Sequence, residues 1–163
     1  LFKGTIAENV AYGRPDATRE EVMNAIVNAQ CKDIIDKLPN GIDTVIGSKG
    51  TYLSGGEQQR IAIARVMLKD SPIIIMDEAT AFADPDNEYR IQKALTNISK
   101  GKTVIMIAHR LSTVVNADRI YVIKDGEIAE SGTSDELMAQ NGLFSKMWNN
   151  YQASVQWKVS KEA

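Results

Sequence analysis

Residues 73–77 read Ile-Ile-Ile-Met-Asp, a short and continuous apolar run that ends in a carboxylate. Such a run is typical of a strand that is covered on both faces, as in a parallel sheet. A second run, TVIMIA at residues 103–108, follows a segment in which Ile91, Leu95 and Ile98 recur at helical spacing. The order strand, helix, strand predicts an α/β fold with parallel strands.

The part before these strands has helical patterns and no clear strand. Residues 1–15 predict an irregular segment, whereas Thr18 and Glu21 have the spacing of a capping box at the start of a helix. Another helix is predicted from Ser54 until Pro72 ends it. We therefore expect three regions, which are a helical subdomain at residues 1–70, a partial α/β core at 71–152 and a C-terminal tail at 153–163.

The last third of the chain predicts a hairpin and a closing helix. Asp125-Gly126 lies between two β-prone runs, which is a strong signal for a tight hairpin turn. Thr133 and Glu136 again have capping-box spacing. An amphipathic helix is expected from about Leu143 onward.

Charge and composition exclude little but favour a cytoplasmic protein. The chain has 19 Lys and Arg residues against 21 Asp and Glu residues, so it lacks the basic balance that would indicate nucleic acid as a partner. Its single cysteine, Cys31, rules out a disulfide within the chain and fits a reducing compartment; we expect it to pack between helices. No apolar run reaches the roughly 18 residues of a membrane span.

Polar residues follow both predicted strands. Asp77 and Glu78 end the first strand, and His109 follows the second. Ligands of open parallel sheets bind beyond the carboxyl ends of the strands. There Asp77 could hold Mg²⁺ and Glu78 could activate water, which suits phosphate chemistry. The alternative is that these acids cap the next helix or simply face solvent.

Ser54-Gly55-Gly56-Glu57 precedes a helix and is the more specific signal. Backbone N–H groups at a helix N-terminus that no side chain obstructs can receive a phosphate. A purely structural explanation is also open, because Ser54 and Glu57 have the spacing of a capping box. Both explanations can hold together, since a hydroxyl has more than one hydrogen-bonding option.

The segment LSGGEQQR, residues 53–60, closely resembles the signature motif of ATP-binding-cassette (ABC) ATPases. IIIMDEAT at 73–80 resembles their Walker B strand, Ala81 to Asp84 lies at the D-loop position, and Ala108-His109-Arg110 is similar to the switch-histidine segment. LFKGTIAENVAYG and GIDTVIGSKGTYLSGGE look like the exporter branch, whose cassettes are fused to a membrane domain.

The resemblance implies an incomplete P-loop NTPase-like ABC ATPase domain that uses ATP and Mg²⁺. Two cassettes would enclose ATP between them, so the signature residues would contact ATP held mainly by the opposite cassette. These residues are Ser54, Gly55, Gly56 and Glu57.

The resemblance also assigns the remaining roles. Asp77 would support Mg²⁺, Glu78 and His109 would be catalytic, and Asp84 would connect the two sites of the dimer. Residues 4–12 would lie near the coupling helices of the membrane domain, at the cytoplasmic face of the cell membrane. Structural alternatives exist here too, because Asp84 before Pro85 is a good N-cap and a lone histidine is usually structural.

A phosphate loop is missing from the sequence. The one Gly-Lys-Thr, at residues 101–103, has Thr96 where a glycine is required, and it precedes a strand. In the family, the phosphate loop lies upstream of a segment like Leu1-Phe2. We therefore expect this chain to be the second half of a cassette and to leave a face or edge of the sheet open. We also expect that the chain alone neither binds ATP tightly nor hydrolyses it.

Two other functions stay open at this point. One is the cassette of a soluble ABC ATPase that works without a membrane domain. The other is a non-catalytic fragment that serves only as a partner surface. The exporter-like N-terminal residues count against the first, and the intact Asp77, Glu78 and His109 count against loss of catalysis in the parent protein.

Overall fold

The computed structural model describes residues 1–47, 50–77, 85–108 and 111–162, with side chains up to residue 153 except that of Pro85. The chain divides into two compact units, Leu1–Ile105 and Met106–Ala163. The division falls within a strand, and each unit is described by itself.

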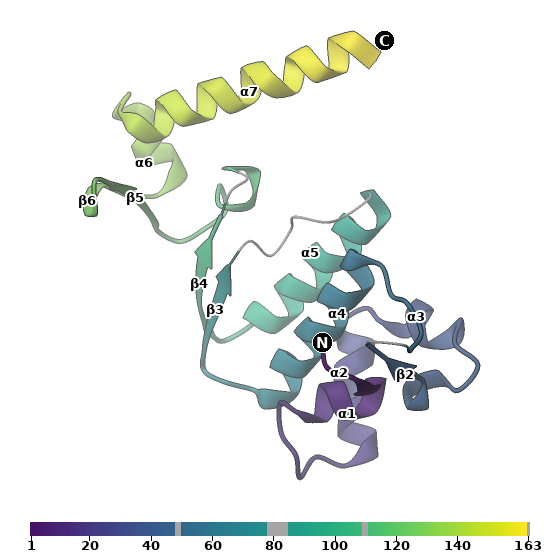
Figure 1. Ribbon diagram of the computed structural model, residues 1–163. Helices are drawn as coiled ribbons and strands as arrows, with labels where there is room; N and C mark the ends of the chain where they lie inside the picture. The colour runs from purple at the N-terminus through teal and green to yellow at the C-terminus, as the bar shows by residue number, and fades with distance from the viewer. Residues whose placement is uncertain (48–49, 78–84, 109–110, 163) are drawn as a thin grey trace. The chain divides into compact units, whose positions relative to one another are not determined.

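The first unit contains the helices and strands from β1 to α5 and the start of β4 (Thr103–Ile107) (Figure 1). Their order is β1 (Gly4–Thr5), α1 (Ile6–Ala11), α2 (Arg19–Asn28), α3 (Lys32–Asp36), η1 (Gly41–Asp43), β2 (Val45–Ile46), α4 (Gly55–Lys69), β3 (Ile73–Asp77) and α5 (Pro85–Ser99). The predicted helices from Thr18 and Ser54 and the predicted strand at 73–77 are confirmed.

The N-terminal segment is more regular than the sequence predicts. Thr5 and Glu8 form a capping box, in which the Thr5 backbone N–H donates to the Glu8 carboxylate at 2.7 Å and the Glu8 N–H donates to the Thr5 hydroxyl at 3.0 Å. This cap starts α1, a helix of only 6 residues. The expectation of an irregular segment was wrong because so short a helix shows little periodicity.

Two short strands were also missed. β1 pairs with β2 in antiparallel orientation, with Gly4 opposite Ile46 and Thr5 opposite Val45. Each strand has 2 residues, too few to show an alternating pattern. The pairing joins segments about 40 residues apart, which local sequence patterns do not reveal.

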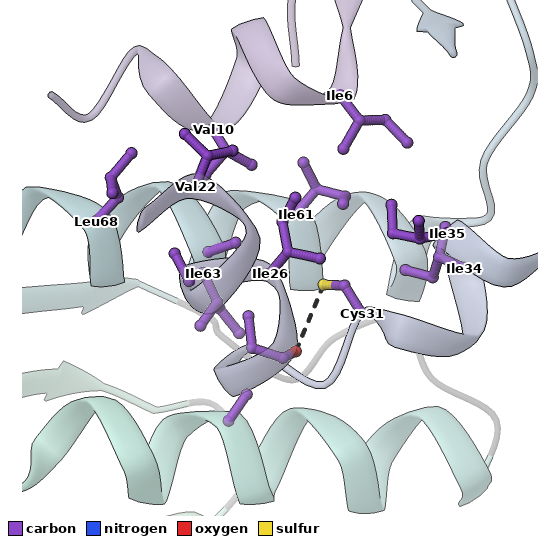
Figure 2. Close-up of a cluster of buried hydrophobic side chains, with 14 of the residues drawn as sticks. Ile6, Val10, Val22, Ile26, Cys31, Ile34, Ile35, Ile61, Ile63 and Leu68 are labelled. Atoms are coloured by element: carbon purple, nitrogen blue, oxygen red, sulfur yellow. Dashed lines mark hydrogen bonds between the residues drawn. The ribbon is translucent and has the colours of Figure 1, made fainter. Parts of the chain in front are cut away.

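The core of the first unit is built by α1, α2, α3, α4 and α5, and Figure 2 shows part of it. Ile6, Ile26 and Ile61 have no exposed surface and come from three different helices. Cys31 is also fully buried, and its thiol lies 3.5 Å from the Ala29 carbonyl oxygen. The expected packing role of Cys31 is therefore confirmed.

β3 and β4 (Thr103–Ile107) are hydrogen-bonded neighbours whose arrows run in the same direction in Figure 1. Ile74 of β3 is buried, but Ile73 and Ile75 are 59% and 69% exposed, and Ile105 of β4 is 52% exposed. Side chains alternate between the faces of a strand, so among the described residues one face of this pair is open. The sequence predicted that both faces of β3 are covered, and this is wrong because Ile73 and Ile75 are exposed. The expectation that the sheet has an open face agrees with these exposures.

The second unit consists of η2 (Leu111–Thr113), β5 (Ile120–Lys124), β6 (Glu127–Gly132), α6 (Ser134–Ala139) and α7 (Leu143–Glu162). β5 and β6 form the predicted hairpin, with Asp125 and Gly126 at φ angles of 53° and 84°. Both positive angles are those of a tight two-residue turn. A small core forms around Ile120, Leu137 and Phe144.

The start of α7 is held by a carboxylate that the sequence did not single out. Glu130 of β6 accepts a hydrogen bond from the Phe144 backbone N–H at 3.0 Å and another from the Leu143 N–H. These two bonds lower the pKa of Glu130. α7 then continues through Glu162, so residues 153–162 of the region expected as a tail are helical. None of the helices that the structure describes is long and apolar enough to cross a bilayer.

Burial of Cys31 predicts an unreactive thiol. Desolvation raises its pKa to about 12, so near pH 8 roughly one molecule in ten thousand carries the reactive thiolate. We expect the native chain to react with a disulfide reagent at least about 100-fold more slowly than the chain unfolded in guanidinium chloride. Rapid native reaction would contradict the packing of this core.

Candidate functional site

The N-terminus of α4 is fixed by a complete capping box. The Glu57 backbone N–H donates to the Ser54 hydroxyl at 3.3 Å, and the Ser54 N–H donates to the Glu57 carboxylate at 2.8 Å. The Gln58 side-chain amide also donates to the Leu53 carbonyl at 2.8 Å. The structural explanation for this motif is thus correct, and it leaves the hydroxyl hydrogen of Ser54 available for a second bond.

The two glycines of this segment differ in their surroundings. Gly55 is exposed and has no side chain that could cover its backbone N–H group. Gly56 is buried, and a Cβ atom placed there would lie 3.0 Å from Cγ and 3.1 Å from Cβ of Asn87 in α5. Gly55 therefore opens the helix end to solvent, whereas Gly56 allows α5 to approach α4.

This helix end has the features of an anion site. α4 has 15 residues, long enough for its aligned peptide dipoles to give its N-terminus partial positive charge. Ser54 is half-buried and Gly55 is exposed. The backbone N–H groups of the first helical turn have no backbone carbonyl partner within the helix. These groups fit the terminal phosphate of a nucleotide.

Asp77 lies at the carboxyl end of β3 and is exposed. Among the described residues, no group of three or more His, Cys, Asp and Glu side chains is placed so that it could hold a metal ion. One carboxylate still fits Mg²⁺, which commonly binds one or two protein carboxylates together with substrate phosphates and waters. Glu78, Asp84 and His109 lie outside the described residues.

A groove of about 700 Å³ lies at the N-terminal segment. Its lining comes from the first residues and from α1, and consists of Phe2, Lys3, Gly4, Glu8, Asn9, Ala11, Tyr12 and Pro15. Tyr12 is 70% exposed and Phe2 is 53% exposed, and their ring centroids lie 5.0 Å apart. The groove thus presents an aromatic surface to solvent.

The side chain of Arg65 connects α4 to this groove. Its Nε donates to the Asn9 backbone oxygen at 2.7 Å, and its Nη2 donates to the Asn9 side-chain oxygen at 3.2 Å. Its guanidinium carbon lies 5.1 Å from the Phe2 ring centroid, within range of a cation–π contact. Sequence patterns did not reveal this role of Arg65, because Asn9 lies 56 residues away in the chain.

Comparisons with known proteins agree with these features. The sequence model described as "ABC transporter" matches residues 2–81. An ATP-dependent lipid A-core flippase of Chromohalobacter salexigens is 52% identical over 147 residues, which are 90% of this chain and 25% of the relative. The mycobactin import ATP-binding/permease protein IrtA of Mycobacterium tuberculosis is 49% identical over 154 residues, 94% of this chain and 18% of the relative.

A solved structure gives the same result for the fold. It is described as a bacterial Atm1-family ABC exporter with ATP bound. The TM-score is 0.84 with 44% identity, over 92% of this chain and 26% of that one. The chain spans about a quarter or less of the length of the relatives and the solved structure described here.

A mixed helix and strand domain with a glycine-bearing helix end and a carboxylate at a strand tip has the layout of part of a P-loop NTPase-type domain. More particularly, the chain belongs to the ATP-binding cassettes of exporter-type ABC transporters and comprises a portion of such a cassette. The fold class and family predicted from the sequence are confirmed.

The capping box predicts the effect of changing Ser54. Ser54→Ala removes the acceptor for the Glu57 N–H, and we expect the free energy of unfolding to fall by about 1 kcal/mol. Ser54→Thr should retain most of the stability because it keeps the hydroxyl. The measurement is denaturant unfolding, with Thr18→Ala in α2 as a matched control for the loss of a cap. An unchanged midpoint for Ser54→Ala would show that the cap contributes nothing.

Proposed function

We propose that this chain supplies the signature and Walker B parts of an ATP-hydrolysing cassette that powers a membrane ABC exporter. The observation that carries the proposal is the N-terminus of α4, where the Ser54 hydroxyl and the backbone N–H groups of Gly55 and Gly56 lie at a helix end that the capping box fixes. In this proposal residues 1–70 form the helical subdomain, and residues 71–152 form part of the ATPase core. Residues 153–163 extend beyond that core.

The signature segment would recognise ATP that is held mainly by a second cassette. The Ser54 hydroxyl can donate to a γ-phosphate oxygen while it accepts from Glu57. The N–H groups of Gly55 and Gly56 belong to the first turn of α4, where a negative charge is favourable. Glu57 would contribute by holding this turn rigid, since its carboxylate is engaged by the Ser54 N–H.

The Walker B residues would perform the chemistry. When bound, Mg²⁺ would neutralise the charge that develops on the transferred phosphoryl group. Asp77 would support this ion, and Glu78 would accept a proton from the attacking water. His109 would contact the γ-phosphate and steady the transition state. Support for these three roles comes from their positions in the family motifs.

Asp84 would connect the two ATP sites across a pair of cassettes. It stands in the D-loop position, directly before α5. The partner would be a second cassette, either identical or different. Because each site would draw residues from both cassettes, hydrolysis would require the pair.

The aromatic groove would receive the coupling helices of the membrane domain. Its exposed Phe2 and Tyr12 give it an apolar surface, and Arg65 fixes it to α4. A helix end that docks there would be mechanically linked to the signature segment. This arrangement would place the cassette at the cytoplasmic face of the cell membrane.

The comparisons favour transport over the alternative of a soluble ABC ATPase. The relatives described above are named as a flippase and as an import permease. Their identities to this chain are similar, at 52% and 49%, although the names refer to lipid A-core and mycobactin. Cargo would therefore be chosen by the membrane domain rather than by this part of the cassette.

The catalytic proposal is tested by Glu78→Gln in the full-length transporter. We expect Mg-ATP hydrolysis to fall by at least about 100-fold because the general base is lost. Mg-ATP binding should persist, since the amide keeps the size of the carboxylate. The measurements are phosphate release and nucleotide binding in lipid vesicles. Full activity in the variant would reject Glu78 as the base.

The division of labour within the cassette is tested on this chain alone. We expect no Mg-ATP binding by titration calorimetry up to roughly millimolar nucleotide, because the sequence contains no phosphate loop. Micromolar binding would mean that a nucleotide site forms without that loop. Circular dichroism of the same sample would verify that the chain is folded.

A further inference from the structure

Asp33 of α3 pairs with two arginines from different helices. Arg60 of α4 donates from Nη1 to Oδ1 of Asp33 at 2.8 Å and from Nη2 to Oδ2 at 3.2 Å. Nη1 of Arg90, on α5, lies 3.5 Å from the same Oδ1 atom. The Asp33 carboxylate thus links α3, α4 and α5 within the first unit.

In this triad of Asp33, Arg60 and Arg90, the two arginines differ in burial. The Arg60 side chain is 1% exposed and also donates to the Gln30 carbonyl oxygen, whereas the Arg90 side chain is 42% exposed. Gln30 adopts a positive φ of 58°, a conformation that L-residues rarely adopt. Because a buried guanidinium without a partner is strongly unfavourable, the Asp33–Arg60 pair must stay intact in the folded chain. The exposed Arg90 side chain can be replaced without leaving a buried charge unpaired.

The triad lies close to the segments proposed to face the second cassette. Arg60 belongs to the helix that begins with Gly55 and Gly56, and Arg90 belongs to the helix that begins at Pro85, directly after the D-loop position. A second contact joins the same helices nearer their starts, because Gly56 packs against Asn87. Two points of contact, one near the first turns and one a turn later, restrict rotation of α4 against α5.

Charge also supports a persistent link. Partial burial acts to raise the pKa of Asp33, but hydrogen bonds from Arg60 and the charges of Arg60, Arg90 and Lys37 outweigh it and lower the pKa. Asp33 therefore stays ionised at neutral pH and attracts both guanidinium groups.

We propose that Asp33 is a positioning residue, which through Arg60 and Arg90 makes the signature end of α4 and the D-loop end of α5 move as one body. This inference rests on the proposed function, in which both ends contribute to ATP sites shared with a second cassette. ATP contact at the signature would then be transmitted within the same chain to the D-loop.

The kinetic test is Arg90→Gln in the full-length transporter. Misplacement of supporting groups lowers the rate of the chemical step, so we expect kcat for Mg-ATP to fall at least about threefold. The KM should change by less than about twofold, since ATP is held mainly by the opposite cassette. Arg90→Lys keeps a positive charge near Asp33 and should restore kcat to within about twofold of wild type.

A matched control is Arg19→Gln. Arg19 of α2 forms an exposed ion pair with Asp43, in which Nη1 donates to Oδ1 at 2.9 Å and Nη2 donates to Oδ2 at 2.6 Å. The pair lies in the same unit, and neither residue belongs to α4 or α5. We expect wild-type kinetics for this variant. An Arg90→Gln enzyme with wild-type kcat, or an equal loss of kcat in the two variants, would overturn the proposal.

Amide hydrogen exchange tests the link without relying on activity. In Arg90→Gln we expect faster exchange both at residues 56–60 and at residues 87–91, because the two helix ends would no longer restrain each other. Faster exchange confined to α5 would reject the inference. A wild-type protein without ATPase activity would reject the proposed function instead, and the exchange result would still decide whether the helices are linked.

Discussion

The packing of one face of α4 into the core is the interaction on which the structure of the first unit depends. Ile61, Ala64 and Leu68 are at most 5% exposed, and they pack into the core that α1, α2 and α5 share. A fully buried isoleucine or leucine side chain contributes roughly 1.5–3 kcal/mol relative to exposure. The polar residues of the same helix act at fixed places because this face is anchored: the capping box lies at its start, Arg60 in its middle and Arg65 near its end.

The capping boxes show why a local motif alone does not identify a binding site. Four helices of the described structure begin with the same reciprocal bonds, at Thr5, Thr18, Ser54 and Thr133. Only the box at Ser54 is followed by two glycines. One of them exposes the helix end and the other permits close packing against α5. The glycines, more than the cap, set the proposed phosphate site apart from the other three helix starts.

Features that depend on neighbouring residues could be predicted from the sequence, and features that depend on distant pairs could not. The hairpin turn at Asp125-Gly126 and the caps at Thr18, Ser54 and Thr133 follow from local chemistry. The Asp33–Arg60 pair, the Arg65–Asn9 contacts and the Glu130 cap of α7 join residues 13 to 56 positions apart. No periodic pattern marks such pairs. Glu78, Asp84 and His109 were predicted from family motifs and stay predictions, because they lie outside the described residues.

The exposed isoleucines of β3 and β4 have a consequence for handling the chain as a separate protein. TVIMIA, at residues 103–108, contains neither a charge nor proline nor glycine, and Ile105 and Ile107 are each 52% exposed. Short segments of this composition stack readily into intermolecular cross-β aggregates. The open face of β3 and β4 is therefore a source of insolubility, so the chain's colloidal behaviour depends on what covers these two strands.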